Sequence, residues 1–189
     1  MKNIPALDPK VLDLVTEISK EPKVEAAMAF IKDQTEVAMQ EQIELCEIEA
    51  PTFHEEKRAA SVAERMRQYG LTDVHIDEIG NVIGIRKGSG NGPVLAIGAH
   101  MDSVFPAGTD VKVKKEGNIY RAPGIGDNCS GLRALLQVLR ALEKEDIRTV
   151  GDIWFVGTVG EEGNGDIRGS KHLCANNKLD GFVAIDSTD

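Results

Sequence analysis

The chain has 189 residues, of which 41% are apolar, and its formal net charge is −9. This length supports one domain with a sizeable core and is too short for two ordinary domains. Acidic residues outnumber basic residues by 31 to 22, and no stretch combines lysine and arginine with aromatic residues. These features exclude a surface for nucleic acid and a surface for anionic membranes.

The N-terminal part of the chain is predicted to be helical. Pro9 and Pro22 each stand at a position that favours the first turn of a helix, so we expect residues 1–45 to be helical. No apolar stretch of a leader peptide precedes them, and no run approaches the roughly 18 apolar residues of a membrane span. We therefore expect a cytoplasmic protein.

The next segment predicts one more helix and then a pair of strands. Thr52 and Glu55 have the spacing of a capping box at the start of an amphipathic helix that ends at Gly70. Alternating residues at 74–76 and an apolar run at 82–85 flank a Gly-Asn turn signal. That arrangement is typical of two strands joined by a turn.

Three nearly continuous apolar runs of strand length follow, at residues 94–99, 153–159 and 182–185. Such runs are typical of strands that are covered on both faces. A leucine-rich amphipathic pattern at 132–142 and a shorter one at 167–175 predict helices between the runs. The sequence therefore predicts an α/β fold with a mostly parallel central sheet flanked by helices.

Residues with metal-ligand chemistry follow each of the three apolar runs. In chain order they are His100 and Asp102 after the first, Glu161 and Glu162 after the second, and Asp186 after the third. A further acid, Asp127, lies in a glycine-rich turn at residues 124–131 that opens the leucine-rich helix. Because ligands collect at the carboxyl ends of the strands in α/β sheets, we expect these side chains to converge on one edge.

Five carboxylates and one histidine in a single cleft would repel one another unless divalent cations were present. Two metals held roughly 3.5–4 Å apart by a shared carboxylate can polarise a carbonyl, lower the pKa of a water molecule and stabilise an oxyanion. Hydrolysis of an amide bond fits that chemistry.

Other local patterns do not support a different catalytic site. The cysteines are Cys46, Cys129 and Cys174. Their odd number and the lack of C-x-x-C spacing argue against a disulfide framework and a thiolate zinc site, and no histidine near Cys129 supports a nucleophile there. Pro123 stands where a dinucleotide-binding fingerprint needs a strand, and Arg58 stands where an H-E-x-x-H motif needs its second histidine.

An ordered set of short motifs over residues 40–189 carries a family resemblance. The motifs are Ala50-Pro51-Thr52-Phe53 with Glu55, Asp77-Glu78-Ile79-Gly80-Asn81-Val82, His100-x-Asp102, Gly126-Asp127 with Gly131, Glu161-Glu162-Gly163, and Asp186. This set resembles the dinuclear zinc metallopeptidases that include aminoacylase, carboxypeptidase G-type enzymes, tripeptide aminopeptidase and succinyl-diaminopimelate desuccinylase. The resemblance implies a zinc-exopeptidase-like (phosphorylase/hydrolase-like) domain, of which residues 1–189 form one incomplete catalytic unit.

The resemblance also implies which residues bind the metals. His100, Asp127 and Asp186 resemble the ligands of one metal, and Asp127 and Glu162 resemble the ligands of a second. Asp127 would then be the shared carboxylate. Two zinc ions are the expected cofactors, although manganese and cobalt tolerate the same ligands.

Two further acids have different implied roles. Asp102 resembles the acid that orients His100 through its other ring nitrogen, and Glu161 resembles the base that takes a proton from the attacking water. The resemblance also implies a cis peptide bond between Asp127 and Asn128. The implied substrate is a small peptide or an N-acyl amino acid.

The chain departs from the family pattern at its end. Family members continue into a lid or dimerisation domain and then supply a late histidine to the second metal. None of His54, His75 and His172 matches that histidine. We therefore expect a truncated catalytic domain with little activity by itself, and a homodimer for the full-length protein.

Two other functional classes remain open. One is a catalytically inactive metal- or peptide-binding domain of the same fold, although the presence of Asp102 and Glu161 favours an enzyme. The other is a related family of dinuclear aminopeptidases that shares the His-x-Asp, bridging Asp and Glu-Glu motifs. The segments at 50–55 and 80–82 fit the first family better.

Overall fold

The computed structural model describes residues 8–187, in which four helices are followed by five strands and then by alternating helices and strands. The helices are α1 (Pro9–Ser19), α2 (Pro22–Asp33), α3 (Thr35–Cys46), α4 (Glu56–Gln68), α5 (Cys129–Lys144) and α6 (Arg168–Asn176), with a 3-10 turn η1 (Gly163–Gly165). The strands are β1 (Asp73–Ile76), β2 (Val82–Arg86), β3 (Leu95–His100), β4 (Lys114–Glu116), β5 (Ile119–Arg121), β6 (Ile153–Thr158) and β7 (Gly181–Ala184). The predicted helical start of the chain is confirmed from Pro9 onward, and residues 1–7 lie outside the described range.

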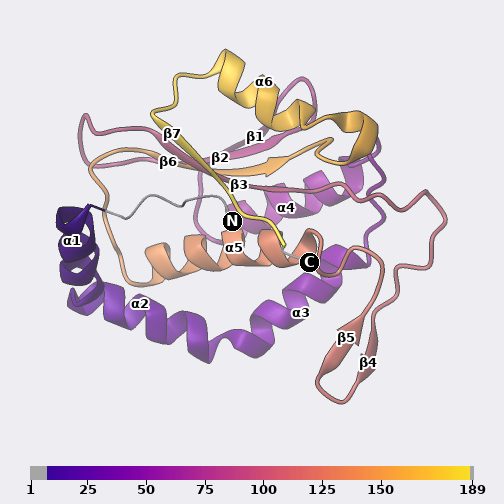
Figure 1. Ribbon diagram of the computed structural model, residues 1–189, viewed down its shortest axis with the longest axis horizontal. Coiled ribbons are helices and arrows are strands. Elements are labelled where there is room, and N and C mark those ends of the chain that lie inside the picture. Colours follow the sequence, from indigo (N-terminus) through magenta and orange to yellow (C-terminus); the bar gives the residue numbers. More distant parts are fainter. Residues whose placement is uncertain (1–7, 188–189) are drawn as a thin grey trace.

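The central sheet has the strand order β1-β2-β6-β3-β7 among the described residues (Figure 1). Strands β6, β3 and β7 run parallel, whereas β1 with β2 and β2 with β6 are antiparallel. The predicted α/β class is confirmed. The sheet is mixed, and its parallel half contains all three strands that precede candidate metal ligands.

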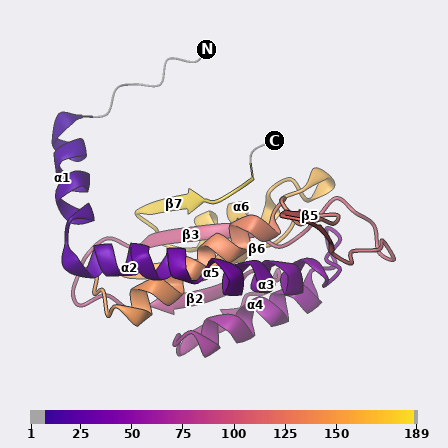
Figure 2. The same cartoon turned by 90° about the horizontal axis from the view of Figure 1, so that it is seen from below.

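Helices cover both faces of this sheet. Helix α5 packs on β3 and β6, and α4 packs on β1 and β2. Helices α2 and α3 lie along the outer side of α5 and add a further layer (Figure 2). Helix α6 lies on the opposite face (Figure 1).

Alternation along β6 separates two apolar cores. Phe155 faces the larger core, which is built with α4 and α5, whereas Val156 faces the smaller core beneath Leu173 of α6. Strand β3 divides in the same way, with Ala99 in the larger core and Ala96 in the smaller one. Because β3 and β6 are buried on both faces, their sequences are nearly continuous apolar runs.

One expectation about strands needs correction, and one hairpin was not predicted. Strand β7 is an edge strand and is not covered on both faces, since Val183 is 49% exposed. Its apolar run reflects only one packed face, where Phe182 contacts the smaller core. The hairpin of β4 and β5 has no counterpart in the sequence pattern, because its strands are three residues long and largely exposed.

The predicted capping box at Thr52 and Glu55 is also wrong. Helix α4 begins at Glu56 without a side-chain cap. The Thr52 hydroxyl instead donates to Asp102, 2.9 Å away, and the Glu55 carboxylate accepts from the backbone of Gly160 at 2.9 Å. Both side chains therefore bond to residues far away in the sequence and not to the first turn of α4.

Helix α1 stands apart from the other elements (Figure 2). None of its residues is buried, and its apolar side chains are exposed at Val11, Leu12, Leu14, Val15 and Ile18. Within residues 8–187, no helix combines the length and the apolar character that crossing a bilayer requires.

The leucines of α5 should contribute most to stability. Leu136 has no exposed surface, so we expect Leu136→Ala to lower the free energy of unfolding by about 2–5 kcal/mol through lost burial and the cavity it leaves. Urea denaturation followed by circular dichroism measures the change. Leu12→Ala on the exposed face of α1 is the control and should stay within about 0.5 kcal/mol of the parent chain. Equal losses in the two variants would contradict the description of the core.

Candidate metal centre

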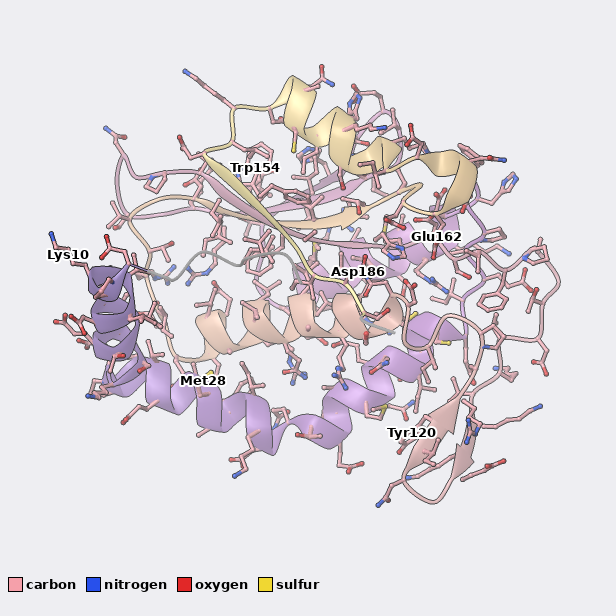
Figure 3. The ribbon with its side chains drawn as sticks, in the orientation of Figure 1. Lys10, Met28, Tyr120, Trp154, Glu162 and Asp186 are labelled. Atoms are coloured by element: carbon pink, nitrogen blue, oxygen red, sulfur yellow. The ribbon has the colours of Figure 1, made fainter. Side chains whose placement is uncertain are left out.

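The parallel strands bring the candidate ligands to one edge of the sheet. His100 is the last residue of β3 and pairs in register with Thr158, the last residue of β6. Strand β7 pairs with the other side of β3 and leads directly to Asp186. Figure 3 shows Glu162 and Asp186 near one another at this end of the sheet.

Three of the candidate residues form one group, and Asp186 lies beside its histidine. The Nε2 atom of His100 lies 2.9 Å from Oδ1 of Asp127 and 3.6 Å from Oδ1 of Asp186. Ligand atoms of His100, Asp127 and Glu162 all lie within 4.8 Å of one another. The imidazole is buried, whereas the side chains of Asp127 and Asp186 are 51% and 48% exposed. The site therefore has a buried nitrogen donor and an open side lined by carboxylates.

The turn that carries Asp127 is held by two hydrogen bonds of the adjacent Asn128 side chain. The Asn128 side chain accepts a hydrogen bond from the backbone of Gly131 at 2.9 Å and caps α5. The same side chain donates to the carbonyl of Ile185 at 2.9 Å, beside Asp186. The Asp127–Asn128 peptide bond is cis, as the family resemblance implied. Asn128 thus connects the start of α5 to the end of β7.

Asp102 is fully buried and contacts His100, Thr52 and the backbone of both glutamates. Its carboxylate accepts hydrogen bonds from the backbone N–H groups of Glu161 and Glu162 at 2.9 and 3.0 Å, and from the Thr52 hydroxyl at 2.9 Å. The Nδ1 atom of His100 lies 3.4 Å from the same carboxylate and 3.1 Å from the Asp102 carbonyl. These contacts hold one ring nitrogen of His100 and leave Nε2 facing the cluster.

The charges in the cluster shift its pKa values. Burial alone would lower the pKa of His100, but Asp102, then Asp186 and Asp127, raise that pKa to about 9. Burial would raise the pKa of Asp102, but the hydrogen bonds from His100 and from the N–H groups at the Glu161–Glu162 turn lower that pKa to about 2. The cluster therefore stabilises positive charge at the position of Nε2.

The two adjacent glutamates face different surroundings. Burial is the main reason that the pKa of each is raised. The negative charge of Asp127 adds to the rise for Glu162. Glu161 lines a cavity of about 270 Å³ together with His100 and Asp186, whereas Glu162 lines a separate hollow of about 330 Å³.

This donor set fits divalent metal ions. It combines one imidazole nitrogen with several carboxylate oxygens that lie close to it. Asp102 orients the imidazole through its other nitrogen, and the neighbouring carboxylates repel one another. Zinc takes histidine and carboxylate ligands of this kind. A cation would replace the proton on Nε2 as the neutralising charge.

The cysteines and the other histidines of the described chain are not part of the cluster. Cys46 and Cys129 are fully buried, so neither presents a thiol to a substrate. His172 on α6 pairs with Glu78 at 2.9 Å, and His75 pairs with Asp73 at 3.6 Å. Neither histidine lies in the cluster.

The comparisons with known proteins agree with this geometry. The profile of peptidase family M20/M25/M40 matches residues 96–188, which contain every candidate metal ligand. The chain therefore contains a segment, close to half of its length, that matches that family. In Pyrococcus abyssi, a protein named as a LysW-lysine/LysW-ornithine hydrolase is 35% identical over 120 residues, which are 64% of this chain and 32% of the relative. The chain thus spans about a third of the length of that relative.

Solved structures of peptidases share the fold. A tripeptidase from Staphylococcus aureus superposes with a TM-score of 0.66 and 30% identity, over 80% of this chain and 43% of its own. Aminopeptidase PepT from Bacillus cereus gives a TM-score of 0.68 with 24% identity over the same shares. The chain described here corresponds to under half of either structure.

Replacing Asp102 with asparagine should loosen the Glu161–Glu162 turn. An amide offers one acceptor oxygen in place of two and adds an N–H group among existing donors, so we expect a loss of about 1–3 kcal/mol in unfolding free energy. We also expect faster hydrogen exchange at the amides of both glutamates. Asp166→Asn is the control, because that side chain is 82% exposed. Unchanged exchange in the Asp102→Asn variant would contradict the assigned hydrogen bonds.

Proposed function

We propose that this chain forms the dinuclear metal centre of a hydrolase that cleaves amide bonds in small peptides or N-acyl amino acids. One observation carries the proposal: the Nε2 atom of His100 and carboxylate oxygens of Asp127 and Glu162 lie within 4.8 Å of one another, beside the buried Asp102. The match of residues 96–188 to the model of a peptidase family supports the same chemistry.

His100, Asp127 and Asp186 would hold one ion, and Asp127 and Glu162 would hold the second. Zinc is the expected ion, although manganese and cobalt accept the same donors. When bound, the two ions would polarise the scissile carbonyl and lower the pKa of the attacking water.

The other two acids have separate roles: Asp102 orients His100, and Glu161 transfers a proton. The carbonyl of Asp102, 3.1 Å from Nδ1 of His100, and its carboxylate, 3.4 Å from the same atom, hold that nitrogen and so keep Nε2 available as a donor to metal. Glu161 is proposed as the general base, whose carboxylate takes a proton from the attacking water and returns it to the leaving amine. Its place beside the cavity with His100 and Asp186 supports that role.

The cellular setting and assembly belong to the same proposal. The free thiols of Cys46, Cys129 and Cys174 fit a reducing compartment, so we place the protein in the cytoplasm. A homodimer is proposed for the complete gene product.

Zinc titration by calorimetry tests the metal centre. We expect two sites of unequal affinity, because three side chains hold the first ion and two hold the second. Asp127→Asn should weaken both sites, and Glu162→Gln should weaken only the weaker one, each by at least the roughly 10–100-fold that loss of an outer partner costs. Asp110→Asn, at an exposed position, is the control. Absence of zinc binding in the parent chain would overturn the proposal.

Turnover is tested in the complete gene product with a panel of dipeptides, tripeptides and N-acyl amino acids. We expect Glu161→Gln to lower kcat by about 10²–10⁴ while the zinc content stays the same, because the variant retains the ligands and loses the base. Chelation should abolish turnover in the parent enzyme. Zinc binding without any turnover would indicate a metal-binding domain, and turnover that survives chelation would contradict the mechanism.

A further inference from the structure

The loop between β6 and α6 carries both glutamates, and its backbone is held by side chains from three other elements. Four consecutive N–H groups are each bound by a buried side-chain oxygen. Val159 donates to Asn81 at 3.1 Å, Gly160 donates to Glu55 at 2.9 Å, and Glu161 and Glu162 donate to Asp102 at 2.9 and 3.0 Å. The path of the chain into the metal centre is therefore imposed by these three side chains.

Glu55 is itself held by Arg168, the first residue of α6. The Glu55 carboxylate is 3% exposed, and both of its oxygens lie 3.3 Å from Nη2 of Arg168. The Nη1 atom of Arg168 donates to the carbonyl of Ile79 at 2.9 Å. A buried carboxylate requires such a partner, because an unpaired charge is strongly disfavoured away from water.

Arg168 also contacts the loop directly. Its backbone N–H donates to the carbonyl of Gly160 at 3.0 Å, and its side chain covers the position that a Cβ atom on Gly160 would occupy. Gly160 has a φ angle of +60°, which glycine adopts readily. The guanidinium lies 5.2 Å from the centre of the Phe53 ring, which stacks on it. Arg168 is thus fixed on several sides at once.

The same residues explain two of the sequence motifs. Glu55 and Phe53 come from the segment that precedes α4, and Ile79 and Asn81 come from the turn before β2. These four residues include one ionisable side chain, Glu55, and it is not part of the cluster of His100, Asp127 and Glu162. Their contacts meet instead at residues 159–169, next to the two glutamates.

We propose that Glu55 and Arg168 are positioning residues that set the metal-binding geometry of Glu162 through the backbone at Gly160. The inference rests on the proposed function, because it assigns Glu162 a metal. Disturbing the pair moves Glu162 relative to Asp127 and leaves the ligands on β3 and after β7 in place. The effect falls on the weaker zinc site alone.

The test is zinc titration of Arg168→Met and of the double variant Glu55→Gln/Arg168→Met. The double variant removes both charges, so it avoids an unpaired buried carboxylate and remains folded if the single variant does not. We expect the weaker site to lose about 10–100-fold in affinity and the tighter site to change by less than about threefold. Arg168→Lys, which keeps the charge, should recover part of the loss. Lys171→Met is the control on the same helix, since its side chain is 55% exposed.

A second background separates positioning from a general structural role. If Arg168 acts through Glu162, its substitution should have no further effect on zinc affinity in a Glu162→Gln chain. Equal effects in the two backgrounds, a parallel loss at both zinc sites, or no effect at all would overturn this inference while leaving the metal centre intact. Absence of zinc binding in the parent chain would overturn the proposed function and this inference together.

Discussion

The Asp102 carboxylate has no exposed surface, and the arrangement of the whole site depends on how its charge is satisfied. A bare carboxylate in this position would be strongly disfavoured. Two backbone N–H groups, the Thr52 hydroxyl and the His100 ring surround it instead. Because these donors come from the segment before α4, from β3 and from the loop after β6, satisfying one charge fixes three parts of the chain relative to one another.

The buried guanidinium of Arg58 on α4 also holds backbone next to the site. Arg58 on α4 is 2% exposed and donates to the carbonyl of Met101 at 2.7 Å and to the carbonyl of Ile48 at 2.6 Å. Met101 lies between His100 and Asp102, so this contact ties the exit of β3 to the chain that follows α3. The helical layer therefore does more than cover apolar surface. It holds the backbone from which the histidine projects.

Much of the fold could be predicted from the sequence because its signals were local. The runs that became β3 and β6 are apolar on both faces, and the leucines of α5 have helical spacing. The convergence of His100 and Glu162 also followed, since ligands collect at the carboxyl ends of adjacent parallel strands, and the turn before α5 was expected to bring Asp127 to the same edge. The roles of Thr52 and Glu55 could not be predicted from the sequence. Their spacing matches a helix cap, and only the folded chain shows that Asp102 and Gly160 take those groups.

Parallel pairing of β3 with β6 and with β7 also constrains how the molecule can assemble. Parallel neighbours cannot be joined by a tight turn, so each of these pairings closes a long loop. Contacts of that kind form slowly, whereas helices and the β1–β2 hairpin rely on residues close in sequence. The helical start of the chain can therefore become ordered while His100, Glu162 and Asp186 are still far apart. Ability to bind a metal would then be acquired late in folding, when the last strand joins the sheet.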